Sequence, residues 1–458
     1  MPKGRGRTSR SRRRKQSRTS EPNGVNESHQ PEFIELKKWL KGRRFDGSNL
    51  RPARFPDTGR GLMATKSLKA GEMIISLPEA CLLTTDTVLK SPLGDYIWKW
   101  KPPVSPLLAL CTFLIAEKQA GARSLWQPYL GVLPQAYTCP VGLDAAVLSL
   151  LPQPLGRRAR EQRTAVRELF AASRAFFSSL QPLFSEDIER VFTLDALGWA
   201  WCTVNTRTVY MEHAQRDCFS AEADIYALAP YLDLLNHSPG AQVEAAFNKE
   251  TRCYEIRTAS RCRKYEEVLI CYGPHDNRRL LLEYGFVCSN NPHSNVVVSP
   301  DVLVRHLPSG DKQMTKKLSL LKEHGFLENL TFGWDGPSWR LLTALKLLRL
   351  GADEFTNWKK VFLGEVISEA NETKSLALAV TLCSYFLEET RAGLQKISQM
   401  KREEVALRNQ LGLVEALRLE ELEILKVSAE VLEGLQRAHA PRCPGTSSRA
   451  PRGCGVLR

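Results

Sequence analysis

The sequence contains no long uninterrupted hydrophobic run. Its longest apolar stretch, residues 106–116, is too short to span a bilayer, and the charged N-terminal residues are not followed by the apolar core of a secretory signal. These absences predict an intracellular, soluble protein with no membrane partner. The twelve cysteines are then expected to be reduced thiols, and none lies at C-x-x-C or C-x-C spacing. The sequence therefore predicts no zinc site and no other metal site.

The positive charge is concentrated at the two ends of the chain. Of the formal net charge of +14, residues 1–18 contribute nine positive charges and residues 440–458 contribute four, and neither segment contains an acidic residue. The rest of the chain is therefore near neutral. A run such as Arg12–Lys15 can attract nucleic acid or an import receptor, and it can equally be an ordinary solvated tail. We expect at most weak nucleic-acid binding through the tails, and a location in the nucleus and cytosol.

Hydrophobic periodicity divides the chain into a mixed half and a helical half. Residues 1–30 and 439–458 are of low complexity and are expected to be disordered. The expected strands are residues 61–65, 73–77, 81–84, 245–247, 254–258 and 267–272, the first three forming one small antiparallel sheet. The expected helices are residues 32–42, 318–324, 339–350 and 375–397, together with a helical region from 106 to about 192. The last apolar repeat, Leu407 to Leu435, fits a coiled-coil seam or a bundle helix, and Gly412 within it favours the bundle.

Three short motifs occur in a fixed order along the mixed half. Gly59-Arg-Gly-Leu-Met-Ala64 contains glycines that let a backbone turn sharply and approach a ligand. Asn236-His237 closes an apolar run, and Tyr272-Gly273 follows 35 residues after His237, with Tyr284-Gly-Phe286 shortly beyond. Singly, Asn-His-Ser-Pro commonly ends a helix and Tyr-Gly commonly ends a strand. The ordered combination favours a functional site.

The ordered set resembles the SET-domain methyltransferases, and in particular the subgroup typified by the plant Rubisco large-subunit lysine methyltransferase. The resemblance covers residues 35 to about 435. It implies an α+β fold in which a β-rich SET domain, residues 31–290 with a helical insertion at about 105–192, precedes an all-α C-terminal substrate-binding domain, residues 300–438. It also implies a protein-lysine N-methyltransferase that uses S-adenosyl-L-methionine and acts on a histone or another protein. Nothing in the sequence indicates the oligomeric state.

The resemblance further implies roles for individual residues. Tyr272 is the expected catalytic residue, because in-line methyl transfer needs an aligned, neutral amine and a tyrosine hydroxyl can hold it. Asp233 and Val209 are expected to lie beside the substrate. Arg207 is expected to hold the carboxylate of the cofactor. The residues expected to bind the cofactor are Gly61, Leu62, Arg207, Asn236, His237, Tyr272 and Tyr284.

Two positions depart from the family pattern. Met63 stands where some relatives carry an arginine that helps to hold the cofactor, so one cofactor contact is expected to be missing. Val209 replaces the polar residue of the relative that methylates histidine, and because valine cannot hydrogen-bond an imidazole, lysine is the expected target. The acidic residue and G-x-G-x-G signature of the Rossmann methyltransferases are absent, which removes that alternative cofactor fold.

Two other functions compete with the enzymatic one. In the first, a degenerate SET-like scaffold grips a protein partner through its helical C-terminal domain without catalysis. Met63 favours this alternative, whereas the retained Asn236, His237 and Tyr272 oppose it. In the second, the protein binds nucleic acid through its tails, which the near-neutral body opposes.

Overall fold

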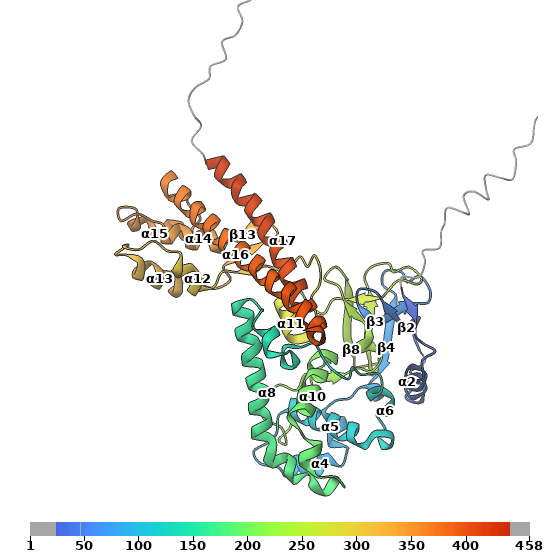
Figure 1. Cartoon of the computed structure of the whole chain (residues 1–458). Coiled ribbons are helices and arrows are strands. Elements are labelled where there is room, and N and C mark those ends of the chain that lie inside the picture. The colour runs from blue at the N-terminus through green and yellow to red at the C-terminus, as the bar shows by residue number, and fades with distance from the viewer. Residues whose placement is uncertain (1–23, 46, 440–458) are drawn as a thin grey trace, which may run out of the picture. The chain divides into compact units, whose positions relative to one another are not determined.

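The computed structural model describes residues 24–45 and 47–439 (Figure 1). The predicted disordered tails fall almost wholly outside these residues. The chain forms two compact units, the first containing residues up to 293 together with 406–414, and the second containing residues 294–405 and those from 415 onward. The fold is α+β, as predicted, with small sheets in the first unit and a mainly helical second unit.

The described strands of the first unit form four small sheets. The strand order is β1-β2-β3 in one three-stranded sheet and β4-β9-β8 in another, β5 pairs with β6, and β7 pairs with β10. All of these pairings are antiparallel except β7 with β10, which is parallel. The bounds are β1 Val25–Asn26, β2 Leu50–Phe55, β3 Gly59–Ala64, β4 Met73–Pro78, β5 Thr208–Tyr210, β6 Tyr226–Leu228, β7 Asn236–His237, β8 Val243–Asn248, β9 Cys253–Thr258 and β10 Leu269–Ile270.

The prediction of one sheet from residues 61–65, 73–77 and 81–84 was wrong. Strand β3 pairs with β2, and β4 pairs with β9, so the first two segments belong to different sheets. The third segment is not a strand, because a 3-10 helix spans Glu79–Cys81 and Thr84 then caps helix α3, Thr85–Leu89. The expected strand 267–272 is also shorter, since only β10 within it is a strand.

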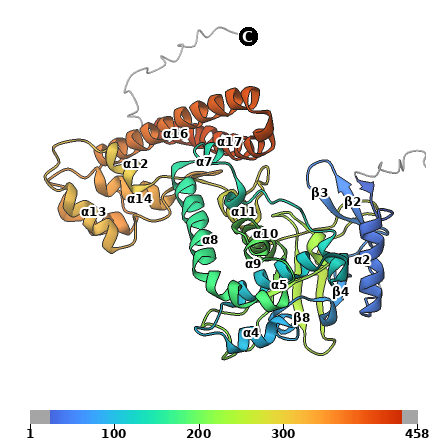
Figure 2. The ribbon, with the colours of Figure 1, turned by 60° about the horizontal axis from the view of Figure 1, so that its bottom comes forward.

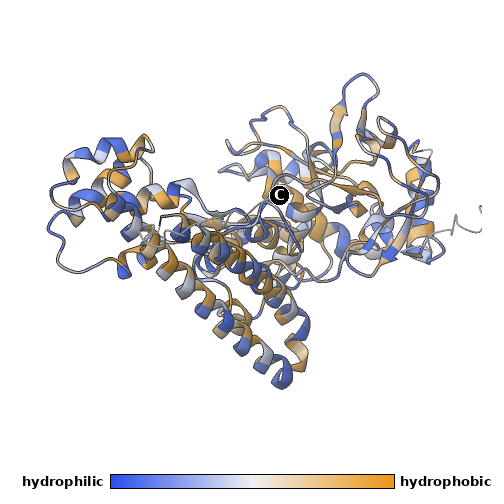
Figure 3. Cartoon of the chain, turned by 90° about the horizontal axis from the view of Figure 1, so that it is seen from above, coloured by the Kyte–Doolittle hydropathy of each residue, from blue (hydrophilic) through white to orange (hydrophobic). Residues whose placement is uncertain are grey.

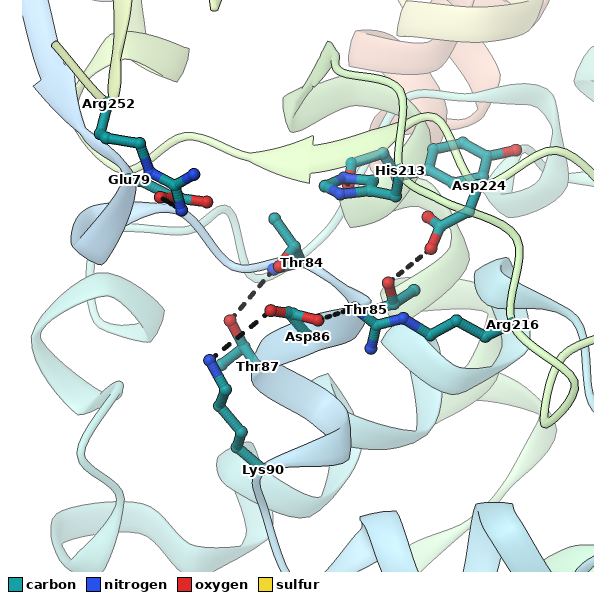
Figure 4. Close-up of polar contacts among 11 residues, drawn as sticks. Glu79, Thr84, Thr85, Asp86, Thr87, Lys90, His213, Arg216, Asp224 and Arg252 are labelled. Carbon is teal, nitrogen blue, oxygen red and sulfur yellow. Dashed lines mark hydrogen bonds and ion pairs between the residues drawn. The ribbon is translucent and has the colours of Figure 1, made fainter. Parts of the chain in front are cut away.

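Polar contacts explain why the chain turns into a helix after residue 84 (Figure 4). The Thr84 backbone N–H donates to the Thr87 hydroxyl, and the Thr85 hydroxyl donates to the buried carboxylate of Asp224. Asp86 in the first turn forms an ion pair with Arg216. These contacts satisfy the N-terminal turn of α3 and attach the segment around residues 216–224 to it.

Most of the described helices of the first unit lie between β4 and β5. The bounds are α2 Pro31–Gly42, α3 Thr85–Leu89, α4 Leu93–Lys99, α5 Pro106–Ala120, α6 Gln127–Leu130, α7 Ala145–Leu148, α8 Gln153–Ser179, α9 Ile188–Val191, α10 Leu194–Arg207 and α11 Asn277–Tyr284. Helix α5 is capped by Ser105, begins with Pro106 and is buried from residue 108 to 115. Helix α10 packs against it and ends at Arg207, so the helical region extends beyond the predicted end at 192.

The second unit is a helical domain with one small sheet. Its helices are α12 Pro300–Arg305, α13 Met314–Glu323, α14 Trp339–Leu348, α15 Trp358–Phe362, α16 Glu369–Glu403 and most of α17 Arg408–His439, and its strands are β11 Val296–Val297, β12 Thr331–Gly333 and β13 Gly336–Pro337. Figure 2 shows α16 and α17 lying side by side, joined by an ion pair between Arg418 and Glu389. Figure 3 shows hydrophobic and hydrophilic residues alternating along these helices, the pattern of bundle helices with one buried face.

A fully buried lysine organises the core of the second unit. The Lys317 ammonium on α13 donates to Asp311 at 2.6 Å and to the Leu350 carbonyl at 2.6 Å. Its contacts tie the start of α13 to the end of α14, because a buried charge is tolerated only where its donors are satisfied.

Among residues 24–45 and 47–439, no helix is long and apolar enough to cross a membrane. The same residues contain no group of three or more His, Cys, Asp or Glu side chains arranged to hold a metal ion.

Candidate active site

The Asn-His and Tyr-Gly motifs meet because their segments pair in parallel. Asn236 lies opposite Leu269 and His237 opposite Ile270, which brings Tyr272 beside His237. The Tyr272 backbone N–H donates to His237 Nδ1 at 3.0 Å, and the two ring centroids are 5.2 Å apart. The Asn-His motif is thus a short strand, and the Tyr-Gly motif follows the short strand that pairs with it.

A strained turn precedes the Asn-His segment and orients Asp233. Tyr231 is buried and has φ 75° and ψ −44°, a conformation that side chains other than glycine rarely adopt. Its hydroxyl donates to the Leu50 carbonyl at 2.9 Å on strand β2, which fixes the residue from the other side. A 3-10 turn, Leu232–Leu234, follows and contains Asp233.

Asp233 and Arg207 form the charged centre of the site. Arg207, the last residue of α10, donates from Nη1 to the Asp233 backbone carbonyl at 2.8 Å, and Tyr129 donates its hydroxyl to Asp233 Oδ2 at 2.8 Å. Burial raises the pKa of Asp233 to about 6, although Arg207 and Tyr129 oppose this shift. Burial alone would lower the pKa of Arg207, but Asp233 and the surrounding tyrosines outweigh it and the net shift is upward. Arg207 therefore stays charged.

Two atoms of this charged centre are buried without a hydrogen-bond partner. They are Arg207 Nε, a donor, and Asp233 Oδ1, an acceptor. Unpaired buried polar groups cost free energy. The unpaired Arg207 Nε and Asp233 Oδ1 therefore indicate that this site binds a ligand.

Tyr272 is held with its hydroxyl pointing at the backbone. The phenol donates to the Leu235 carbonyl at 2.6 Å, so its proton is committed and its oxygen lone pairs remain available. Burial raises the pKa of Tyr272 far above its usual range, since the opposing charge of Arg207 is the smaller effect. The residue is therefore a neutral phenol at physiological pH.

A cavity of about 260 Å³ brings together five of the residues singled out in the sequence. Arg207, Val209, Asp233, Tyr272 and Tyr284 all line it. Val209 comes from β5, and Tyr284 from the end of α11, where its ring centroid is 5.0 Å from that of Tyr272. The other lining residues are Thr206, Thr208, Tyr210, Leu232, Leu235, Ala245, Tyr254, Ile256, Ile270 and Cys271. The wall is therefore largely apolar, with a few polar groups aimed inward.

Gly61 and Leu62 lie on β3, next to the Asn-His segment. The Asn236 amide nitrogen donates to the Arg60 carbonyl at 2.9 Å and to Glu267 Oε1 at 2.8 Å. A Cβ at Gly61 would stand 2.4 Å from Glu267 Oε1, so glycine is needed for this close approach. The Leu62 side chain is fully buried in the core, which leaves its backbone as the part that can reach a ligand.

Met63 is buried among apolar side chains. It is buried in a small cluster with Ala53 and Phe55, on the β1-β2-β3 sheet. The side chain that replaces the arginine of some relatives thus makes an apolar contact between neighbouring strands.

His237 is a neutral, buried imidazole. Burial is the largest cause that lowers the pKa of His237 to about 4, and nearby histidines lower it further. Its Nε2 has no hydrogen-bond partner, while its ring lies 5.9 Å from that of Phe286. Since Nδ1 accepts from Tyr272, Nε2 carries the proton and is a free donor.

Sequence reasoning did not find three residues that contact this site. Tyr129, on α6 inside the helical insertion, donates its hydroxyl to Asp233. The Tyr137 hydroxyl, next to Arg207, accepts from the Thr203 hydroxyl at 3.0 Å. Glu267 accepts from the Asn236 amide. The tyrosines lie in a helix and a loop without a motif, and nothing local in the sequence distinguishes them. Glu267 stands five residues before Tyr272, and this spacing was the one available signal.

Two family models and a close relative fit this arrangement. Residues 59–273 match the SET domain, and residues 308–425 match the Rubisco LSMT substrate-binding domain. The human protein "SET domain-containing protein 4" is 67% identical over 438 residues, which is 96% of this chain and 100% of that protein. The chain belongs to the SET-domain methyltransferases. Its cofactor is accordingly S-adenosyl-L-methionine.

A more distant relative and a solved structure also match most of the chain. The fission yeast Schizosaccharomyces pombe protein "Ribosomal lysine N-methyltransferase set11" is 27% identical, covering 70% of this chain and 75% of its own. A crystal structure of the SET domain of LSMT bound to lysine and AdoHcy superposes with a TM-score of 0.59, at 20% identity, over 90% of this chain and 93% of that one. At that identity the superposition shows a shared fold.

The residues present suit this cofactor. The carboxylate at the amino-acid end of the cofactor needs a cation, and the site offers the charged Arg207, whose Nε is a buried donor without a partner. An adenine ring needs an apolar and aromatic surface with a donor, and Tyr284, Phe286 and His237 Nε2 provide these groups.

Proposed function

We propose that this SET-domain enzyme transfers a methyl group from S-adenosyl-L-methionine to the side-chain amine of a lysine in a histone or another protein. One observation carries the proposal. Tyr272, Asp233 and Arg207 all line one largely apolar cavity of about 260 Å³.

In this proposal the cofactor lies between the glycine strand and the Asn-His segment. Asn236 and His237 bind it by side-chain and backbone groups, Arg207 pairs with its carboxylate, and Gly61 and Leu62 offer backbone groups. Tyr272 and Tyr284 form the aromatic wall. When bound, the cofactor supplies an electrophilic methyl group on a sulfonium.

Tyr272 would align the acceptor amine. Because its proton is donated to Leu235, its oxygen can only accept an N–H from the amine, which leaves the nitrogen lone pair free to point at the methyl group. A lysine with a pKa of about 10.4 must first lose a proton, and desolvation in an apolar cavity lowers that pKa. Asp233 Oδ1 can accept a hydrogen bond from the entering ammonium, which then gives up its proton to bulk water.

The acceptor is proposed to be lysine because of the cavity wall. Val209 lines the cavity and has no polar atom to pair with an imidazole nitrogen. The second unit, which matches the substrate-binding family model, is proposed to grip the protein substrate. The fission yeast relative is named for a ribosomal lysine, so ribosomal and other non-histone proteins belong among the candidates to be tested together with histones.

The basic N-terminal segment is proposed to act as an address or tether. Its nine positive charges would promote nuclear entry and weak, salt-dependent nucleic-acid association, so we propose residence in both nucleus and cytosol.

Incubation of the protein with cell lysate and labelled S-adenosyl-L-methionine tests the function directly. Labelled peptides identified by mass spectrometry should carry methyllysine, and the label should be absent when Tyr272→Phe replaces the wild type. A wild-type protein that binds the cofactor and partner proteins but labels nothing would favour the non-catalytic scaffold. Label on histidine would overturn the assignment of lysine.

A further inference from the structure

Glu267 forms a small polar network with the Asn-His segment. Its Oε1 accepts from the Asn236 amide at 2.8 Å, and both of its oxygens accept from the Thr58 hydroxyl, at 2.8 and 2.7 Å. The residue is half-buried, and its backbone bridges to Met63 on the glycine strand. Glu267 therefore joins the loop before β3, the strand itself and the Asn-His segment.

The network determines which edge of the Asn236 amide remains for a ligand. An amide nitrogen has two N–H groups, and here one donates to the Arg60 carbonyl and the other to Glu267. The Arg60 carbonyl and the Glu267 carboxylate can only accept. Exchanging the nitrogen and oxygen of the Asn236 amide would therefore lose both hydrogen bonds. Only Oδ1, an acceptor, is left over.

The glycine at position 61 is part of the same arrangement. A Cβ there would lie 2.4 Å from Glu267 Oε1 and 2.7 Å from Asn236 Nδ2. The absence of a side chain at Gly61 thus provides the space in which carboxylate and amide meet.

We propose that Glu267 is a positioning residue for the cofactor site, holding Asn236 so that its Oδ1 accepts a hydrogen bond from the ammonium of the cofactor's amino-acid end. The inference rests on the proposed function, in which Asn236 contacts that end. Glu267 itself touches no reacting atom. Its carboxylate is the acceptor that prevents Asn236 from presenting N–H groups to a cation, and the Thr58 hydroxyl stabilises that carboxylate.

Four variants of the full-length chain separate positioning from a merely structural role. Glu267→Ala removes the acceptor, and Glu267→Gln keeps a carbonyl that can still accept from Asn236. Thr58→Val removes the second contact of the carboxylate at an exposed position. Glu266→Ala is the matched control, because the neighbouring Glu266 carboxylate contacts Arg263.

Calorimetric titration with S-adenosyl-L-methionine and steady-state kinetics give the decisive readouts. We expect Glu267→Ala to raise the dissociation constant and the KM for the cofactor roughly tenfold, as loss of a charge-assisted contact does, with kcat at saturating cofactor retained. Glu267→Gln should restore affinity to within about twofold, Thr58→Val should weaken it less than Glu267→Ala, and Glu266→Ala should match the wild type.

The outcomes separate the positioning role of Glu267 from the proposed function of the protein. Unchanged cofactor affinity in a folded Glu267→Ala protein would overturn the positioning role while leaving the proposed function standing. Equal losses in the Ala and Gln variants would overturn it too, because the amide keeps the acceptor. If Glu267→Ala fails to fold, the comparison of Gln, Thr58→Val and wild type decides. A folded wild type that binds no cofactor would overturn the proposed function and this inference together.

Discussion

Replacement of Tyr272 by phenylalanine is the most direct perturbation of the site, because it deletes one oxygen and keeps the ring. That oxygen donates to the Leu235 carbonyl at 2.6 Å, and Tyr272 lines the cavity, where the proposed function has its oxygen accept from the amine. Losing the donor leaves a buried carbonyl unpaired, which should cost about 1 to 2 kcal/mol of folding stability. In a unit of this size, each kcal/mol of lost folding stability lowers the melting temperature by about 2 to 4 °C.

The effect of Tyr272→Phe on catalysis should be much larger than its effect on stability. Loss of a positioned group that aligns the amine typically reduces turnover by about 10² to 10⁴, equivalent to about 3 to 5 kcal/mol of barrier. The assay is transfer of labelled methyl to a verified substrate, with cofactor affinity measured separately by calorimetry and expected to change little. Tyr265→Phe, at an exposed tyrosine of the same unit, is the control and should retain full turnover. Wild-type turnover in a folded Tyr272→Phe protein would remove Tyr272 from the mechanism.

Four further expectations concern the cofactor site, the core of the second unit, the N-terminal segment and Asp233. Asn236→Ala and His237→Ala should each weaken cofactor binding by about 1 to 3 kcal/mol, and unchanged calorimetric affinity in both would place the cofactor elsewhere. Lys317→Met should lower the free energy of unfolding of the second unit by about 3 kcal/mol in chemical denaturation, because Asp311 and the Leu350 carbonyl lose their buried donor. Deletion of residues 1–18 should leave melting temperature and cofactor affinity nearly unchanged while nucleic-acid association and nuclear entry fall; lost methyl transfer on a short peptide would show instead that the segment belongs to the active site. Methyl transfer should decline as the pH drops through about 6, where Asp233 gains a proton, and a pH profile of Asp233→Asn lacking that step checks the assignment.

The strands that were predicted correctly are those whose alternation is visible locally. Strand β9, Cys253–Thr258, alternates buried and exposed side chains and was recognised, as was its partner β8. Strand β2, Leu50–Phe55, was missed because Pro52 and two arginines give it the composition of a loop, and it is a strand because β1 and β3 pair with it from both sides. The segment 81–84 is apolar enough for a strand, but the hydroxyls of Thr84 and Thr87 cap a helix there.

The structure brings the Asn-His and Tyr-Gly motifs together, but the sequence could not supply the contacts that support them. The pairing of β7 with β10 was not visible in the sequence, because two residues on each side carry no periodicity. The positive φ of Tyr231 was equally hidden, since tyrosine is a residue that local rules place elsewhere. Both features depend on distant partners, Leu50 for the Tyr231 hydroxyl and Leu269 for Asn236. Long-range contacts of this kind override local propensity where a site needs an unusual backbone.

The protonation states around the cavity are arranged so that one group changes charge near neutral pH. Burial keeps His237 neutral by lowering its pKa to about 4, and burial keeps Tyr272 neutral by raising its pKa, while Arg207 stays charged. Asp233, with a pKa near 6 compared with about 3.9 in an unfolded chain, is ionised only above pH 6. Between these two values the folded protein binds the additional proton, so ionisation of Asp233 lowers stability as the pH rises through that window. Ionised Asp233 therefore lowers folding stability, and its Oδ1 has no hydrogen-bond partner. A cationic ligand explains such a carboxylate better than folding does. In the proposed reaction, that cation is the ammonium of the substrate lysine.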